Sequence, residues 1–202
     1  MSLGIVIAQG IRHITERLPG ILEDGENGLR GAFRQLIQRL GDHLKELDRQ
    51  VVQLEREIQQ WHRGNEDSYR LAQIPDVGPI TASALVASVG DAKSFANGRE
   101  MAAWLGLVPR QHSSGGMSTL LGISKRGDCY LRTLMVHGAR AVVRYAESKT
   151  DPSADWLKSL LGRRNTNVAV VAQANKKARI AWALLAHDRR FRPDYTPDVT
   201  GV

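Results

Sequence analysis

The sequence predicts an all-α protein, in which a long coiled-coil helix precedes a compact helical domain with a helix-hairpin-helix-like motif. Apolar residues between positions 33 and 61 recur at alternating spacings of four and three, which is typical of a coiled-coil seam. A proline- and glycine-containing turn at residues 74–79 separates two further helical patterns. Almost no segment alternates polar and apolar residues with the period of a strand.

The long helix is expected over residues 29–64, between a lead-in segment at 1–28 and a helical domain at 65–192. The intervening positions are mostly Arg, Glu, Asp, Lys and Gln, as expected for a solvated face. The pattern predicts an oligomerisation arm; the alternative is a long helix that packs on the rest of its own chain. The seam positions are Phe33, Ile37, Leu40, Leu44, Leu47, Val51, Leu54, Ile58 and Trp61.

Positive charge is concentrated in the second half of the chain. Residues 1–105 carry 12 Lys and Arg against 14 Asp and Glu, whereas residues 106–202 carry 16 against 7. Because neutralising phosphates and releasing their counterions supplies most non-specific affinity, this half is predicted to face nucleic acid. An ordinary basic surface that aids solubility is the alternative.

The segment at residues 69–89 predicts two helices joined by a tight turn, with the second helix beginning at Pro79. In a helix-hairpin-helix such a turn directs backbone N–H groups at a phosphate, and Gly78 marks the point of close approach. Asp76 stands where that motif usually carries glycine, and its charge disfavours phosphate. A plain helical hairpin that closes the core is the alternative.

Two adjacent serines precede a glycine pair within the segment Gly106 to Arg132, in which the glycines and Pro109 disfavour regular helix. Paired serines ringed by cations suit either the binding of a phosphate or attack on one. Further helices are expected at residues 95–105, 128–145, 156–161 and 168–186, with a loose tail at 193–202. The predicted nucleic-acid contacts are Gly78, Arg110, Lys125, Arg126, Arg132, Arg163, Arg164, Lys176 and Lys177.

The cysteine, the histidines and the apolar runs of the sequence restrict the classes of function that it can have. Cys129, the single cysteine, excludes an internal disulfide and is expected to be a small buried residue. The six histidines show no metal-ligand spacing, so no metal site and no cofactor are predicted within this chain. No run of about 18 apolar residues is present, which predicts no membrane span.

Four segments together resemble the insertion-sequence-one-ten transposase family, which includes the Piv-type DNA invertases and the bridge-RNA-guided recombinases. The resemblance extends from about residue 4 to residue 193, and its segments are IPDVGPITASALVASVGD, FANGREMAAWLGLVPRQHSSGG, LLGISKRGDCYLRTLMVHGARAV and NKKARIAWALL. It implies a coiled coil followed by a helical domain whose catalytic serine matches Ser114, with Ser113 as the alternative.

The same resemblance implies several partners. Members carry an N-terminal RuvC-like domain with four metal-binding acidic residues, for which Mg²⁺ is expected; that domain is not recognisable in this sequence. DNA, a guide (bridge) RNA and a homo-oligomer, either a dimer or a tetramer, are the implied partners, in the prokaryotic cytoplasm at the nucleoid.

Three functions remain open at the level of sequence. The first is the serine-bearing domain of a DNA recombinase, which we expect to bind DNA without turnover when this chain is alone. The second is a non-catalytic helical module that binds nucleic acid and dimerises. The third is a small-molecule phosphoryl enzyme, which is disfavoured because the sequence has no Gly-rich loop that ends in Lys-Ser or Lys-Thr. His112 is a candidate general base.

Overall fold

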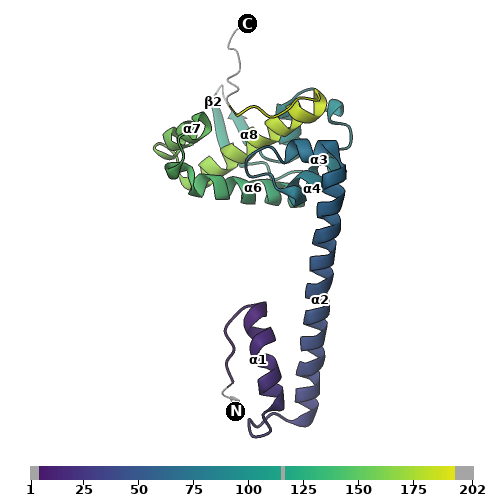
Figure 1. Cartoon of the computed structure of the whole chain (residues 1–202). Helices are drawn as coiled ribbons and strands as arrows, with labels where there is room; N and C mark the ends of the chain where they lie inside the picture. Colours follow the sequence, from purple (N-terminus) through teal and green to yellow (C-terminus); the bar gives the residue numbers. More distant parts are fainter. Residues whose placement is uncertain (1–4, 115–116, 194–202) are drawn as a thin grey trace. The chain divides into compact units, whose positions relative to one another are not determined.

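The computed structural model describes residues 5–114 and 117–193, and between residues 112 and 120 it describes the backbone without the side chains. Within this part of the chain there are eight α-helices and a single two-stranded sheet, so the predicted predominance of helix is confirmed (Figure 1). The chain divides into two compact units, Met1–Glu57 and Ile58–Val202.

The first unit is a helical hairpin made by α1 (Ile11–Glu23) and the first half of α2 (Gly31–Gly64). The segment predicted as a lead-in therefore contains a helix. Leu18 of α1 is buried against Gly41 of α2, where a Cβ atom would lie 2.5 Å from Leu18 Cδ2. A glycine inside α2 costs helix propensity, and here it admits the side chain of the neighbouring helix.

Arg34 on α2 ties down the end of α1 and the loop that follows. Its guanidinium donates to the carbonyls of Ile21 at 3.2 Å and Leu22 at 2.6 Å, and to Asn27 Oδ1 at 2.9 Å. The last carbonyls of a helix have no partner within the helix, so a cation at this end satisfies them and complements the helix dipole.

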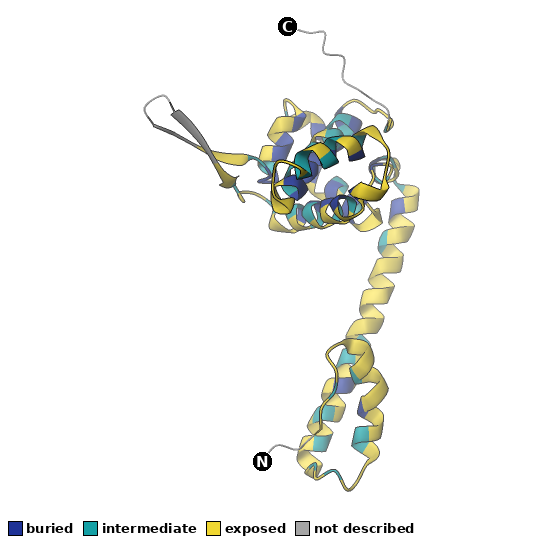
Figure 2. Ribbon diagram, turned by 90° about the vertical axis from the view of Figure 1, so that its left-hand side faces the viewer, coloured by how far each residue is buried: buried dark blue, intermediate teal, exposed yellow. Residues whose placement is uncertain are grey.

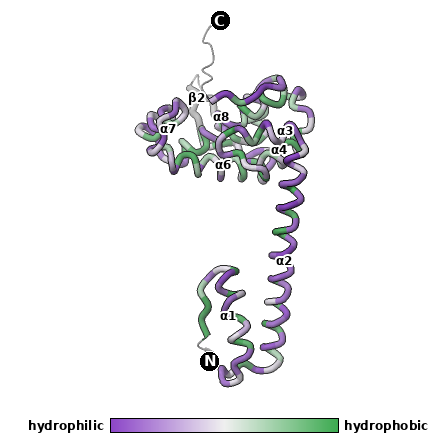
Figure 3. Tube along the Cα trace, viewed as in Figure 1, coloured by the Kyte–Doolittle hydropathy of each residue, from purple (hydrophilic) through white to green (hydrophobic). Residues whose placement is uncertain are grey.

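Most positions of the apolar seam of α2 are exposed to solvent, and Figure 3 shows hydrophobic positions spaced along an otherwise hydrophilic helix. Helix α1 covers a neighbouring strip, where Ile37 and Leu44 are half-buried. Exposed fractions along the uncovered seam are 45% for Phe33, 51% for Leu36, 60% for Leu40, 45% for Leu47, 53% for Val51 and 56% for Leu54.

The second unit begins with the last turns of α2. His62 Nδ1 lies 2.7 Å from Ser68 Oγ, and Ser68 Oγ lies 3.3 Å from Ser83 Oγ. Both His62 and Ser68 are buried, and the three side chains connect α2 to α3 (Glu66–Leu71) and α4 (Pro79–Val89). A buried polar network of this kind fixes the helices in one arrangement, because each group would lose its partner if a helix shifted.

Helix α8 (Thr166–Ala186) is the centre of the second unit and contacts α3, α5 (Gly98–Trp104), α6 (Cys129–Arg144) and α7 (Pro152–Leu161). Figure 2 shows buried residues concentrated in these helices. Short 3₁₀ turns at Ala92–Ser94 and Ala146–Ser148 complete the unit. Trp182 Nε1 on α8 donates to the carbonyls of Ala92 and Phe95, which fastens the first of these turns.

Most of the predicted helices are present, with shifted ends. Asp128 caps α6 through a 2.9 Å hydrogen bond from Leu131 N, as its position predicted. Helix α7 begins at Pro152 rather than at Trp156, because Asp151 accepts hydrogen bonds from the N–H groups of Ser153 and Ala154. The predicted start of this helix at residue 156 was therefore wrong by four residues.

The turn between α3 and α4 has Gly78 as the N-cap of α4, and Asp76 adopts a left-handed φ of 75°. Gly138 of α6 allows this turn to pack closely, since a Cβ there would collide with the Asp76 carbonyl oxygen. The two helices lie where they were predicted; phosphate binding by a helix-hairpin-helix at this turn stays a prediction.

Candidate functional site

The serine segment is not helical, as predicted, and it forms a β-hairpin that the sequence did not predict. Strands β1 (Pro109–Ser114) and β2 (Met117–Ile123) pair antiparallel, with Ser114 opposite Met117 and Ser113 opposite Ser118. The two candidate nucleophiles therefore end β1, at the last pairs before residues 115–116, which lie outside the described residues. The strands leave the helical body at mostly exposed positions, as Figure 2 shows for the start of β1 and the end of β2.

The root of the hairpin is built from two backbone contacts that require glycine. Gly106 (φ 72°) and Gly127 (φ 91°) have left-handed conformations, and a Cβ on either would collide with a backbone carbonyl, that of Arg126 or of Trp104 respectively. Two hydrogen bonds join the same segments, Ser124 N to Val108 O at 2.8 Å and Lys125 N to Gly106 O at 3.2 Å. The chain entering the hairpin is thus fixed to the chain leaving it.

Arg132 braces this root from the inner side of α6. Its Nη1 donates to the carbonyl of Leu105 at 3.2 Å and to that of Arg126 at 3.4 Å, and the residue is half-buried. It was predicted as a nucleic-acid contact on a free surface, and the structure instead gives its guanidinium a role in holding the hairpin. The sequence could not reveal this, since the two carbonyls come from separate segments.

Three of the predicted cations are exposed at the hairpin and its root. Arg110 lies on β1 beside the irregularity between Pro109 and Gln111, and Lys125 and Arg126 lie in the turn that follows β2. Lys125 adopts a left-handed φ of 55°, and Arg126 N donates to Ser124 Oγ at 3.4 Å. These positive charges come from the same structural unit as the serines, as phosphate binding requires.

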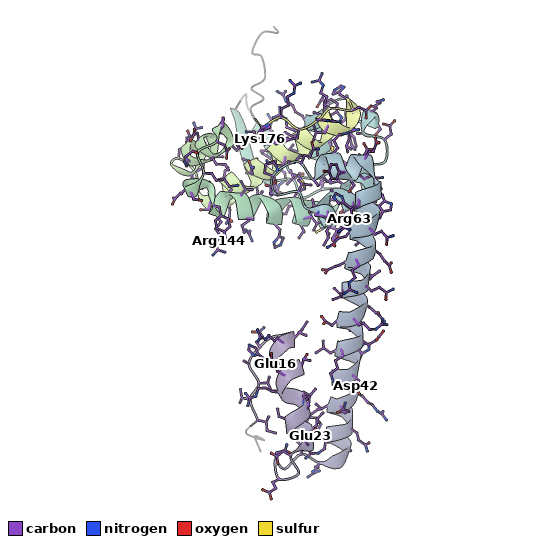
Figure 4. The ribbon with its side chains drawn as sticks, in the orientation of Figure 1. Glu16, Glu23, Asp42, Arg63, Arg144 and Lys176 are labelled. Carbon is purple, nitrogen blue, oxygen red and sulfur yellow. The ribbon has the colours of Figure 1, made fainter. Side chains whose placement is uncertain are left out.

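Other predicted contacts lie on different elements. Arg163 and Arg164 are exposed in the turn between α7 and α8, and Gly78 is exposed at the start of α4. Lys176 is half-buried with its Nζ 4.5 Å from the centre of the Trp156 ring, and burial lowers its pKa. Figure 4 labels Lys176 on α8.

Lys177 is not part of an exposed phosphate-binding surface, contrary to the prediction, because only 4% of it is exposed. Burial lowers its pKa, and the charge of Asp76 acts in the opposite direction. Burial likewise raises the pKa of Asp76 to about 6, against the charge of Lys177 and the amide of Gln173. Both polar groups, the Asp76 carboxylate and the Gln173 amide, are buried without a hydrogen-bond partner among the described residues.

Three further predictions have different outcomes. The prediction that Cys129 is buried was wrong, since it is exposed in the first turn of α6. The side chains of His112, Ser113 and Ser114 lie outside the description, so their catalytic roles stay predictions. Across the described residues, no group of three or more His, Cys, Asp and Glu side chains is placed to hold a metal ion, and no helix has the length and apolar character to cross a membrane.

Sequence comparisons assign the helical unit to the transposases. The model of the family described as "Transposase IS116/IS110/IS902 family" matches residues 68–153, which extend from α3 through the hairpin and α6 to the start of α7. The chain belongs to this family of insertion-sequence transposases.

Two curated relatives cover most of the chain. A "Probable family 20 transposase" of Pseudomonas aeruginosa is 55% identical over 159 residues, which are 79% of this chain and 47% of that protein. The "Transposase for insertion sequence element IS1111A" of Coxiella burnetii is 44% identical over 189 residues, 94% of this chain and 52% of that protein. The chain thus spans about half the length of these relatives.

A third relative connects the family with DNA inversion. The "Pilin gene-inverting protein" of Moraxella bovis is 35% identical over 79 residues, 39% of this chain and 24% of that protein.

Proposed function

We propose that this chain is the DNA-binding, serine-bearing part of an insertion-sequence transposase or site-specific recombinase, which exchanges DNA strands through a phosphoserine link. The observation that carries the proposal is the hairpin, whose root is fixed by Gly106, Gly127 and Arg132 and whose first strand ends in Ser113 and Ser114. A nucleophile is most effective when a rigid scaffold determines its position.

In the proposed reaction the hydroxyl oxygen of Ser114 attacks the phosphorus of a DNA phosphodiester. A bond forms between the serine oxygen and phosphorus while the bond to one deoxyribose oxygen breaks; the serine proton passes to a base, for which His112 is the candidate, and the released deoxyribose oxygen takes up a proton. The number of phosphoester bonds is conserved, so reversal with a different deoxyribose hydroxyl rejoins the strands. Arg110, Lys125 and Arg126 are the cations available to stabilise the negative phosphoryl oxygens.

A serine hydroxyl is a weak nucleophile without further activation. Following the family resemblance, we propose that a RuvC-like domain contributes Mg²⁺ to the complete site. Bound divalent ions stabilise attacking and leaving oxygens in phosphoryl transfer. This chain would contribute the nucleophile, the DNA-binding cations and the rigid hairpin.

The experiment supplies this chain with the RuvC-like domain fused ahead of it, adds substrate DNA and Mg²⁺, and measures covalent protein–DNA adducts on denaturing gels. Ser114→Ala should abolish the adduct while DNA affinity changes by less than about twofold, because a neutral hydroxyl contributes little to charge-driven binding. Ser113→Ala is the matched control and should retain the adduct. Adducts in Ser114→Ala but not in Ser113→Ala would transfer the role to Ser113, and adducts in both variants would refute the serine mechanism.

The exposed seam of α2 favours a second candidate, a non-catalytic module that dimerises and binds DNA or a guide RNA. Exposed apolar side chains recur along α2 at intervals of two turns or less. Their exposure to water is unfavourable in free energy unless another surface covers them. We propose that a second copy of the chain covers it, which is compatible with both candidates. DNA binding without any adduct in the fused protein would favour the non-catalytic module.

A further inference from the structure

Helix α6 has two faces with different roles. Its inner face holds the core residues Leu131, Met135, Ala139 and Val143, and also Arg132, which braces the hairpin root. Its outer face is exposed along the whole helix and carries Tyr130, Thr133, His137, Arg140 and Arg144. These residues recur at spacings of three and four, which places them on one strip.

The outer face has the chemistry of a nucleic-acid contact. The 16 residues Cys129–Arg144 include no Asp or Glu, and neither Arg140 nor Arg144 forms an ion pair with any described residue. Arg144 points away from the helical body in Figure 4, and its guanidinium carbon lies 5.8 Å from the centre of the Tyr145 ring. Exposed arginines beside exposed aromatic residues are typical of surfaces that bind a polyanion.

We propose that this outer face of α6 docks against double-stranded DNA, at a surface separate from the serine hairpin. The inference rests on the DNA partner of the proposed function. Tyr130 and Arg144 are separated by about 21 Å along the axis, at about 1.5 Å per residue, so the exposed strip extends over about four helical turns, and its two arginines lie about one turn apart at its C-terminal end. The major groove of B-form DNA admits an α-helix, whereas the deep, narrow major groove of duplex RNA does not, which favours DNA.

Such docking would make α6 a connection between the DNA and the serine hairpin. The helix contacts the hairpin root through Arg132 on one side, and through Arg140 and Arg144 it would contact the DNA backbone on the other. Phosphate contacts set the position and orientation of a protein on a duplex without reading its sequence. The DNA contact of α6 would therefore orient the hairpin relative to the strand that it attacks.

The test measures the binding of the full chain to a fluorescent DNA duplex of about 30 base pairs by anisotropy, over a range of salt concentrations. An RNA duplex of the same length is measured in the same way. Arg140→Gln with Arg144→Gln should weaken binding by about tenfold and reduce the slope of log affinity against log salt by about 2, as expected for two lost phosphate contacts. Arg39→Gln with Arg56→Gln, two exposed arginines of α2, removes the same charge and should change affinity by less than about twofold.

Five outcomes decide the proposal. The expected difference between the two pairs of variants supports it. Equal losses in both pairs would show a general effect of net charge and overturn it. A loss for duplex RNA with unchanged DNA binding would overturn the assignment to DNA. Unchanged binding by the α6 variants would overturn this inference alone, whereas a wild-type chain without affinity for DNA would overturn the proposed function as well.

Discussion

Helices α2 and α8 both repeat apolar residues at helical spacing, yet they use them in opposite ways. The 34 residues of α2 expose seven large apolar side chains between Phe33 and Leu54. The 21 residues of α8 are buried on several sides, and the buried set includes the polar residues Gln173 and Lys177. The comparison shows that periodicity identifies a helix but not its surroundings: the apolar side chains of α2 are largely exposed, whereas those of α8 are enclosed by other helices.

The buried charge beside α8 should produce the largest effect, a pH dependence of stability. Because burial raises the pKa of Asp76 to about 6 from its ordinary value of 3.8, the folded state binds a proton more readily than the unfolded state. The contribution of Asp76 to the free energy of unfolding is therefore most favourable below about pH 4 and falls as pH rises to about 6, by up to about 3 kcal/mol.

Urea unfolding at pH 4 and at pH 7 measures this contribution when the wild type is compared with Asp76→Asn. Asparagine tolerates the left-handed conformation of this position and does not titrate. The difference in stability between the two proteins should change with pH in the stated direction. Identical pH profiles would show that the carboxylate is solvated and that α8 does not bury a charge pair here.

A matched pair of core and surface substitutions should have the next largest effect. Val170 on α8 is 1% exposed, whereas Val51 on α2 is 53% exposed. Val170→Ala should lower the free energy of unfolding by about 2 kcal/mol, because two buried methyl groups are lost and a cavity remains. Val51→Ala should lower it by less than about 0.5 kcal/mol at dilution where the chain is monomeric. Equal losses, measured by urea unfolding, would contradict the contrast between the helices.

Sequence reasoning succeeded where the signal is local. Asp128 and Pro79 mark the starts of α6 and α4 by their own hydrogen-bonding and backbone preferences, and both positions were predicted. Sequence reasoning failed where the surroundings of a residue come from segments that are distant in the sequence. Arg132 and Lys177 look like surface cations in the sequence, but carbonyls and a carboxylate from distant segments surround them.

The β-hairpin was missed for a physical reason as well. Its strands consist largely of Ser, Thr, Gly and Leu, and they project from the body instead of lying on the core with one face. None of the strand residues outside 112–120 is buried, and strands without a buried face need no alternation of apolar residues, so the period of two is absent. The glycines that anchor the root indicated a turn, but the backbones that they contact could not be inferred.

Substitutions in the seam of α2 should have the smallest effect on the free energy of unfolding, but a large effect on self-association. Leu47→Glu with Leu54→Glu should change the free energy of unfolding of the monomer by less than about 0.5 kcal/mol, since both residues are exposed. The same pair should abolish self-association in sedimentation experiments, because it places charges within an apolar interface.

Gln53→Glu with Gln60→Glu adds the same charge on the opposite side of α2 and should leave association intact. A wild-type chain that sediments as a monomer at every concentration would remove the basis for the proposed arm. Retained association in the leucine variants would place the interface elsewhere.

The contact between Leu18 and Gly41 restricts how α1 can move. Gly41 leaves room for Leu18 at one height on α2, and a shift of one helical turn, about 5.4 Å, would set Leu18 against Ile37 or Lys45 instead. Sliding therefore meets side chains in both directions, while complete separation meets none. The contact between Leu18 and Gly41 consequently fixes the register in which α1 packs on α2.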